Sequence, residues 1–241
     1  MRMSSNWLAR TELLIGQQNI EKLKNAHVLV AGLGGVGGYA AEQLCRCGIG
    51  KLTLADSDVV QPSNRNRQLI ALLSTESQKK ADVFYNRFLD INPSVKLTIV
   101  DEYLIDESID KLLETPYDYI IDAIDTLTPK IQLLSKAKLK GFQMVSSMGS
   151  GGKFAPEKLE IADISESHHC KFAYIIRKYL RKYGVTDGIK VVYSPEPVSK
   201  SAVQAVEGEQ NKKSIVGTIS YMPAVFGCFC ASLVIRDLLD L

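Results

Sequence analysis

Four glycines near the start of the chain have the spacing of a phosphate-binding turn, G-x-G-x-x-G. They are Gly32, Gly34, Gly35 and Gly37. Glycines in such a turn let backbone N–H groups approach a phosphate closely, and the start of the following helix favours an anion. Asp56 lies 24 residues after Gly32, at the end of the next apolar run, where a carboxylate can accept hydrogen bonds from ribose hydroxyls. The pattern predicts a nucleotide site and fits NAD and other adenine nucleotides equally.

The residues after Asp56 favour triphosphate chemistry over hydride transfer. Segment 56–68 reads DSDVVQPSNRNRQ, and Lys80 follows it on a segment of helical spacing. Hydride transfer has little use for several cations beside the phosphates, whereas splitting a triphosphate requires that its developing charge be neutralised. We therefore expect phosphoryl or adenylyl transfer.

Alternating strand and helix patterns must position these groups. Apolar runs predict strands at 27–32, 51–56, 95–100, 119–124 and 142–147, and helical spacing predicts helices at 36–47, 77–91, 106–114 and 128–140. Such alternation is typical of an α/β fold, here a Rossmann-like, doubly wound, mostly parallel sheet covered on both faces. The polar segment after Asp56 then lies just beyond the carboxyl end of the second strand.

The pattern changes beyond residue 150. The runs 158–164 and 189–194 flank a basic helix at 171–182 and predict an antiparallel C-terminal extension of the sheet. Residues 198–213 are polar with little apolar periodicity, which predicts a mobile loop that could act as a lid. The apolar stretch 219–235 is broken by polar residues, proline and glycine and is shorter than the ~20 residues that cross a bilayer. We expect a buried helix there and no membrane contact.

The composition of the 241 residues excludes several classes of protein. Lys and Arg number 29 against 27 Asp and Glu, a net charge of +2, which excludes a polycationic tail or an acidic solvating chain. With 46% apolar and 23% charged residues the chain is globular rather than disordered. The N-terminal residues lack a secretory pattern, so a cytoplasmic location is expected. The five cysteines include CxC pairs but no CxxC pair, which predicts reduced thiols and no zinc site.

Together these motifs resemble the ubiquitin-activating-like (ThiF-type) adenylating enzymes, which include the activators of the molybdopterin and thiamine sulfur-carrier proteins. The resemblance rests on GLGGVG, ADSDVVQPSNRNRQ, QKKAD, DAIDT at 122–126 and Arg10 ahead of ELLIG. It covers essentially the whole chain. It implies one adenylating domain over 1–241, with an N-terminal helical arm (1–25), a nucleotide-binding core (26–150) and a substrate and dimer region (151–241).

The resemblance also implies ATP and Mg²⁺ as cofactors and a homodimer as the working form. Asp56 is assigned to ribose, and Asp125 to Mg²⁺ and the reacting phosphate. Arg10 is assigned to a finger that reaches the ATP of the partner subunit. The remaining nucleotide-binding candidates are the four glycines, Asn64, Arg67, Gln68 and Lys80, and the catalytic candidates are Arg67, Lys80, Asp125 and Arg10.

Each of these assignments has a structural alternative. Arg67, Lys80 and Arg10 could be solvated surface charges in weak ion pairs. Asp125 stands directly before Thr126 and a helical run, so it could cap that helix. A cap at the carboxyl end of a strand can also ligate a metal, and the two roles are compatible.

The C-terminal third resembles one branch of the family, the tRNA threonylcarbamoyladenosine dehydratases, also described as sulfur-acceptor-linked proteins. The matching pieces are VVYSPEP at 191–197, the basic helix HHCKFAYIIRKYLRK and the segment VGTISYMPAVFGCFCASLVIRDLL. This resemblance implies that ATP activates the threonyl carboxylate of a modified adenosine in tRNA. An internal nucleophile then closes a ring, with release of AMP and pyrophosphate and net loss of water. It also implies a cysteine desulfurase or sulfur-acceptor system as a partner.

A tRNA substrate requires a cationic surface, because phosphate contacts supply most of the affinity. Segment 171–182 interleaves cations with aromatic residues, and we expect tRNA contacts from Arg177, Lys178, Arg181 and Lys182. A second surface could involve Lys200, Lys212 and Lys213. The same helix could equally be a solvated face whose aromatic residues belong to the core. Two other functions stay open: an activator of a ubiquitin-like or sulfur-carrier protein, and a nucleotide-binding adaptor without turnover.

Overall fold

A seven-stranded sheet forms the centre of the computed structural model, which describes residues 6–205 and 214–241. The strand order is β3-β2-β1-β4-β5-β7-β6. The strands are β1 (His27–Ala31), β2 (Lys51–Ala55), β3 (Lys96–Val100), β4 (Tyr119–Asp122), β5 (Met144–Ser147), β6 (Glu160–Asp163) and β7 (Lys190–Tyr193). The sequence-based prediction of a doubly wound, mostly parallel sheet is confirmed.

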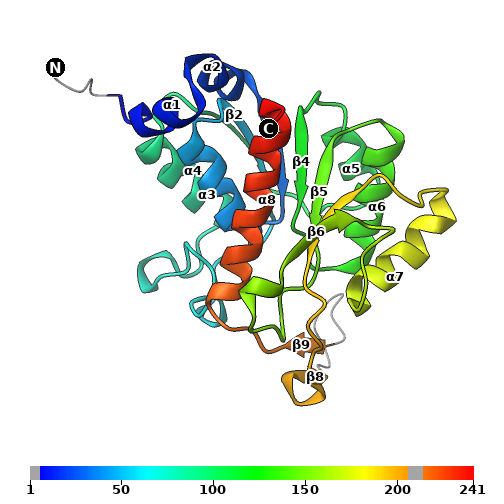
Figure 1. Ribbon diagram of the computed structural model, residues 1–241. Coiled ribbons are helices and arrows are strands. Elements are labelled where there is room, and N and C mark those ends of the chain that lie inside the picture. Colours follow the sequence, from blue (N-terminus) through cyan, green and yellow to red (C-terminus); the bar gives the residue numbers. More distant parts are fainter. Residues whose placement is uncertain (1–5, 206–213) are drawn as a thin grey trace.

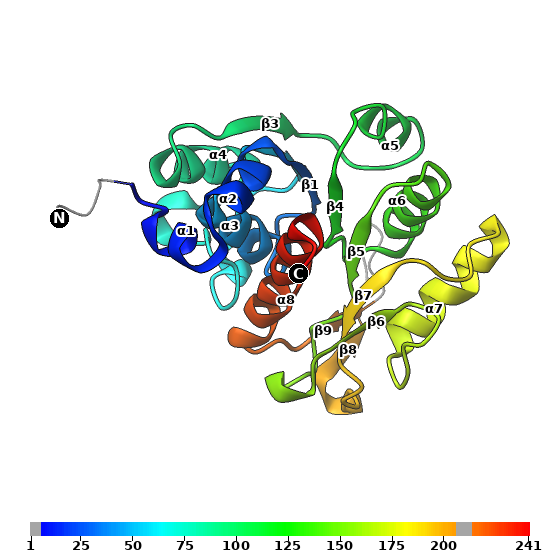
Figure 2. The same cartoon turned by 45° about the horizontal axis from the view of Figure 1, so that its top comes forward.

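Helices cover both faces of this sheet (Figures 1 and 2). One layer contains α2 (Gln17–Asn25), α3 (Gly37–Cys47), α4 (Lys80–Ile91) and α8 (Tyr221–Leu239), with α1 (Ala9–Ile15) packed on α2. The other contains α5 (Glu107–Leu112), α6 (Leu127–Leu139) and α7 (Lys171–Leu180). The chain order reverses between β1 and β4, and ligands of doubly wound sheets bind where the order reverses, beyond the carboxyl ends of the strands.

The C-terminal extension is only partly antiparallel. β6 pairs antiparallel with β7, as predicted, but β7 pairs parallel with β5. The reason is the position of β6 in the chain. β6 runs opposite to β5 and ends where Asp163 pairs with Lys190, the first residue of β7. β7 therefore begins at the same edge of the sheet as β5 and runs parallel to it.

The segment expected to be a mobile loop, 198–213, contains local structure. A 3₁₀ turn at Lys200–Ala202 leads into β8 (Val203–Ala205), which pairs antiparallel with β9 (Ser214–Val216). Val203 lies opposite Val216, and such β-branched pairs favour strands. Residues 206–213, including Lys212 and Lys213, lie outside the described residues.

α8 is long and apolar enough to cross a membrane, yet half of it is buried inside the protein. It packs against α3, β5 and β7, which confirms the predicted buried helix and extends it to Leu239. Its Gly227 meets the first turn of α3, where a Cβ would overlap the Val36 carbonyl oxygen. Cys230 is buried, whereas Cys228 lies on the opposite face of the helix and is exposed.

The contact at Gly227 leads to a test of the α3–α8 packing. A Gly227→Ala substitution should lower the free energy of unfolding by about 1–3 kcal/mol, because the added methyl group has no space beside the α3 backbone. Urea denaturation measures this change. The neighbouring Cys228→Ala, on the exposed face, should leave stability within about 0.5 kcal/mol of the parent protein. Equal stability of the two variants would contradict the packing described here.

Candidate nucleotide-binding site

The glycine turn between β1 and α3 leaves no space for side chains at three of its four glycines, Gly32, Gly35 and Gly37. Gly32 has a left-handed backbone, φ 87°, and a Cβ there would lie 2.8 Å from the carbonyl oxygen of Ala123. A Cβ on Gly37 would overlap the Gly32 carbonyl oxygen. At Gly34 the space is open, with Gln68 Nε2 the nearest atom at 3.8 Å. The turn thus presents bare backbone at the start of α3, the arrangement that binds phosphate at a helix N-terminus.

Asp56, directly after β2, holds this turn in place. One carboxylate oxygen accepts a hydrogen bond from the Leu33 N–H at 2.6 Å, and the other accepts one from the Asp58 N–H at 2.8 Å. Burial raises the pKa of the Asp56 carboxyl, while the nearby Lys80 ammonium acts in the opposite direction. Each carboxylate oxygen can accept a second hydrogen bond, so anchoring the turn leaves capacity for a ribose hydroxyl.

Lys80, the first residue of α4, is buried, so it is not the solvated surface charge that the sequence alone also allowed. Its side chain is only 5% exposed, and its Nζ lies 2.7 Å from Asp58 Oδ2 and 4.0 Å from Asp56 Oδ1. The predicted helix at 77–91 begins only at Lys80, because the backbone of Lys79 is still extended. This start places the ammonium beside the carboxylate that anchors the glycine turn.

The segment 61–68 folds over the other side of the turn. The Arg67 side chain packs beside Gly35, and its Nη1 donates to the Ser63 carbonyl oxygen at 3.0 Å. Asn64 is buried, and its amide oxygen accepts a hydrogen bond from the Gln61 N–H. Asn64 therefore shapes this segment, whatever it also offers a ligand.

Gln68 carries a buried polar atom that lacks a partner. Its side chain lies next to Gly34, and its Oε1 makes no hydrogen bond with the part of the chain that the structure describes. Orphaned buried polar atoms are rare in folded proteins, because each costs roughly 1–3 kcal/mol. A nucleotide bound above the glycine turn would supply a hydrogen-bond donor for this oxygen, so the residues around the turn fit such a ligand.

The loop between β4 and α6 abuts the glycine turn and carries Asp125. Asp125 is exposed, and the N-cap of α6 is Thr126, which makes no side-chain capping bond. The sequence reasoning missed Lys130, which forms a fully buried ion pair with Asp122 at 2.6 Å. Its signal was a position one helical turn before Leu134, on the buried stripe of α6.

Arg10 lies away from this site in the same chain. It is exposed on α1, and Leu8 at the start of this arm packs against Gly48, just beyond the C-terminus of α3. The glycine turn is at the other end of α3, an 11-residue helix and thus about 16 Å long. Figure 1 shows α1 near the end of the sheet opposite β8 and β9.

The cations of α7 do not all have the same surroundings. Arg177 is half-buried, and its Nη1 donates to the carbonyl oxygens of Ile164 and Ser167 at 3.0 and 2.6 Å. The remaining cations of the segment are exposed: Lys171, Lys178, Arg181 and Lys182. Tyr174 and Tyr179 are 60% and 42% exposed, so these aromatic side chains are not core residues.

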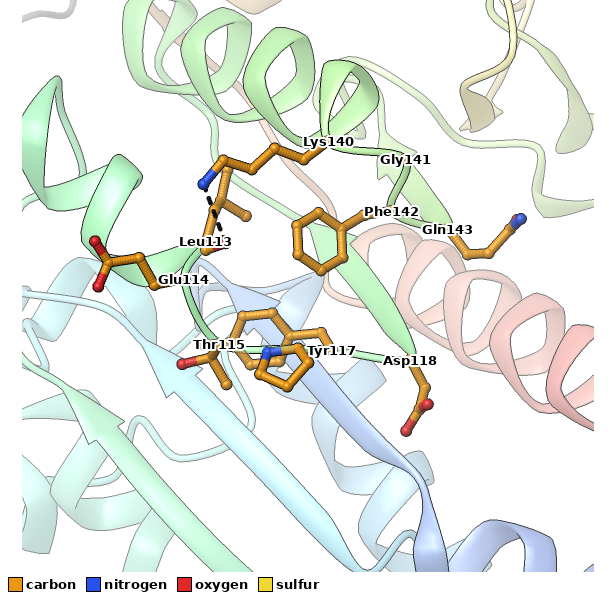
Figure 3. Close-up of a pocket in the computed structure, with 10 residues that line it drawn as sticks. Leu113, Glu114, Thr115, Tyr117, Asp118, Lys140, Gly141, Phe142 and Gln143 are labelled. Carbon is orange, nitrogen blue, oxygen red and sulfur yellow. Dashed lines mark hydrogen bonds between the residues drawn. The ribbon is translucent and has the colours of Figure 1, made fainter.

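Two shallow pockets lie at the amino edge of the sheet, remote from the glycine turn. The larger has a volume of about 540 Å³ and is lined by residues 113–118 and 140–143. Figure 3 shows Tyr117 and Phe142 on its walls and the hydrogen bond from Lys140 to the Leu113 carbonyl oxygen. Neither pocket contains a residue that the sequence assigned to a site.

The chain is similar to known proteins along almost its whole length. The ThiF family model matches residues 8–241. A tRNA threonylcarbamoyladenosine dehydratase of Bacillus subtilis (strain 168) is 37% identical over 238 residues, covering 96% of this chain and 94% of the relative. The crystal structure of Escherichia coli tRNA N6-threonylcarbamoyladenosine dehydratase, TcdA, in complex with ATP covers 100% of this chain and 98% of its own, with a TM-score of 0.89 and 29% identity. The complex of TcdA with AMP has a TM-score of 0.88.

Similarity to the activators of carrier proteins is more restricted. A molybdopterin-synthase adenylyltransferase of Salmonella typhimurium is 36% identical over 113 residues, covering 47% of this chain and 45% of the relative. The family match, by contrast, extends from α1 through α8, and it includes the glycine turn, the Asp56 segment and the β4–α6 loop. The chain therefore belongs to the ThiF family.

Proposed function

We propose that this protein is an ATP-dependent tRNA threonylcarbamoyladenosine dehydratase. It adenylates the threonyl carboxylate of the modified adenosine and gives the cyclic form, with release of AMP and pyrophosphate. The observation that carries the proposal is the bare glycine turn, bordered by Asp56, Arg67 and the buried Lys80, in a chain that matches such dehydratases along almost its whole length. Activation of a carrier protein is the alternative, and the similarity to its enzymes, which covers 47% to 64% of this chain, supports it less.

The chemistry follows from the charges around the turn. A carboxylate is a poor electrophile until one of its oxygens becomes part of a good leaving group, and AMP provides one. Arg67 and Lys80 would neutralise charge on the phosphates as it develops, which lowers the barrier. To do so the Lys80 ammonium would exchange Asp58 for a phosphate oxygen. The attacking nucleophile belongs to the substrate, so the protein contributes mainly positioning.

Asp125 is the residue proposed to hold Mg²⁺. Magnesium in nucleotide sites is commonly held by one or two carboxylates together with phosphate oxygens, and an exposed carboxylate beside the glycine turn suits that mode. The ion would polarise the phosphate under attack.

We also propose that the protein works in the cytoplasm as a homodimer. Arg10 lies on α1, which packs at the end of α3 opposite the glycine turn, too far away to serve the site of its own chain. A second copy could bring an Arg10 to the nucleotide. Leu13 and Leu14, on the same short helix as Arg10, are 89% and 83% exposed, which suits a surface that a second copy covers.

The nucleotide preference can be tested by titration calorimetry with ATP and NAD. We expect ATP with Mg²⁺ to bind more tightly than NAD. Gly34→Ala should fold normally, since its Cβ has space, yet lose about 10- to 100-fold in ATP affinity, because the methyl group obstructs a charge-assisted hydrogen bond to phosphate. Tight NAD binding without ATP binding would refute the proposal.

The roles of Asp125 and Arg10 can be separated by mixing subunits. Asp125→Ala should keep the fold and lose about 100-fold or more in ATP turnover, because a metal ligand is worth several kcal/mol in the transition state. A mixed dimer of Asp125→Ala and Arg10→Ala subunits should regain part of the activity, because one of its two sites is then complete. A verified mixed dimer without any recovery would restrict Arg10 to its own subunit.

The RNA surface can be tested by charge reversal at the exposed cations of segment 171–182. Because Arg177 is engaged with backbone carbonyl groups, the test uses Lys178→Glu, Arg181→Glu and Lys182→Glu together. We expect weaker tRNA binding, with the salt slope reduced by about one unit per lost phosphate contact, and unchanged ATP affinity.

The matched control reverses three exposed lysines outside segment 171–182, namely Lys51, Lys96 and Lys111. It changes the net charge equally and should leave tRNA binding nearly as it was. If both triple variants bind tRNA alike, segment 171–182 is a solvated face, and Lys200 becomes the next candidate.

A further inference from the structure

The ion pair between Asp122 and Lys130 takes no part in the steps above, yet it is completely buried. Both side chains are 0% exposed, and Lys130 Nζ lies 2.6 Å from Asp122 Oδ2. Removing two charges from water costs several kcal/mol per ion, and well-packed apolar residues are often as stable as a buried pair. Stability alone therefore does not account for this pair.

Each member of the pair forms a hydrogen bond with the loop between β4 and α6. Asp122 Oδ1 accepts a hydrogen bond from the Ile124 N–H at 3.1 Å, and Lys130 Nζ donates to the Ile124 carbonyl oxygen at 3.0 Å. Ser146 on β5 completes the arrangement by donating its hydroxyl to Asp122 Oδ2 at 2.6 Å. One charged group thus fixes each polar atom of the Ile124 backbone.

The β4–α6 loop is also packed closely against the glycine turn, so the two segments have little space to move relative to each other. The N–H of Ala123 donates to the Ala31 carbonyl oxygen at 2.8 Å, and a Cβ on Gly32 would lie 2.8 Å from the Ala123 carbonyl oxygen. Asp125 follows Ile124 directly. Any change in the path of the Ile124 backbone therefore moves the Asp125 carboxylate relative to the phosphate-binding turn.

We propose that Asp122 and Lys130 are positioning residues, which hold the β4–α6 loop so that the Asp125 carboxylate meets the metal–nucleotide complex. The inference rests on the proposed function, because that function assigns Asp125 to Mg²⁺. The charges are needed because each pairs with one Ile124 atom at the strength of a charge-assisted hydrogen bond. Apolar replacements would fill the space but leave the loop without these contacts.

The test uses the double variant Asp122→Asn, Lys130→Met, in which no charge is left unpaired. We expect its urea midpoint to stay near that of the parent protein. Amide exchange at residues 123–126 of the ligand-free protein should accelerate at least about tenfold. The Mg²⁺ concentration that half-saturates the complex with a non-hydrolysable ATP analogue should rise about 10- to 100-fold, as for other residues that orient metal ligands. Affinity for the analogue without metal should not change.

Two further variants keep the result interpretable. Lys190→Met disrupts another ion pair of the same sheet, with Asp237 at 2.7 Å, and should change neither amide exchange at 123–126 nor Mg²⁺ affinity. Ser146→Ala removes one hydrogen bond to Asp122 and should produce a smaller shift in the same direction, which decides the question if the double variant does not fold.

The inference is overturned if the folded double variant, or Ser146→Ala in its place, keeps the parent rates of exchange and the parent Mg²⁺ affinity. A parent protein that binds the ATP analogue and Mg²⁺ but does not act on modified tRNA would refute the proposed function instead. Exchange and metal affinity would still report on the positioning pair in that case, so the two failures are distinct.

Discussion

The close approach of two backbone segments, the glycine turn after β1 and the loop after β4, is the constraint on which the candidate site depends. Gly32 and Ala123 come so near that no Cβ fits between them. This contact lies where the strand order reverses, and it brings the phosphate-binding turn and the Asp125 loop to one edge of the sheet. Asp56 then fixes the turn from the β2 side through the Leu33 N–H.

Buried charge is concentrated around this contact. Lys80 lies beside Asp56 and Asp58 on one side, and Lys130 lies against Asp122 on the other. The two lysines differ in what they are able to do. Lys80 shares its ammonium with the exposed carboxylate of Asp58, which suits the proposed exchange for a phosphate. Lys130 is enclosed with its partner under Phe172 and donates to a backbone carbonyl oxygen.

The sequence was sufficient for the strands and for the position of the glycine turn between β1 and α3, because apolar runs and glycine spacing are local properties. The direction of β7 was not accessible, since it depends on which strands β7 lies between in the sheet and not on the residues of β7 itself. Burial of charged groups was harder to predict. Lys130 had only its position on the apolar stripe of α6 as a signal, and Lys80 had none, so the fold was needed to show that their ammonium groups are enclosed. Arg177 resembled a surface cation for the same reason, although its guanidinium is bonded to carbonyl groups.

α8 has a consequence for the order in which the protein can fold. Pro223 in its first turn lies against Gly35, and Gly227 lies against the start of α3. The last helix of the described chain therefore packs directly against the glycine turn. Contacts between residues so distant in sequence form late, since long loops must close before such contacts contribute. During synthesis the sheet edge can assemble early, but the phosphate-binding turn gains its final packing only after α8 has been made. A growing polypeptide would therefore be unable to hold nucleotide as the finished protein does.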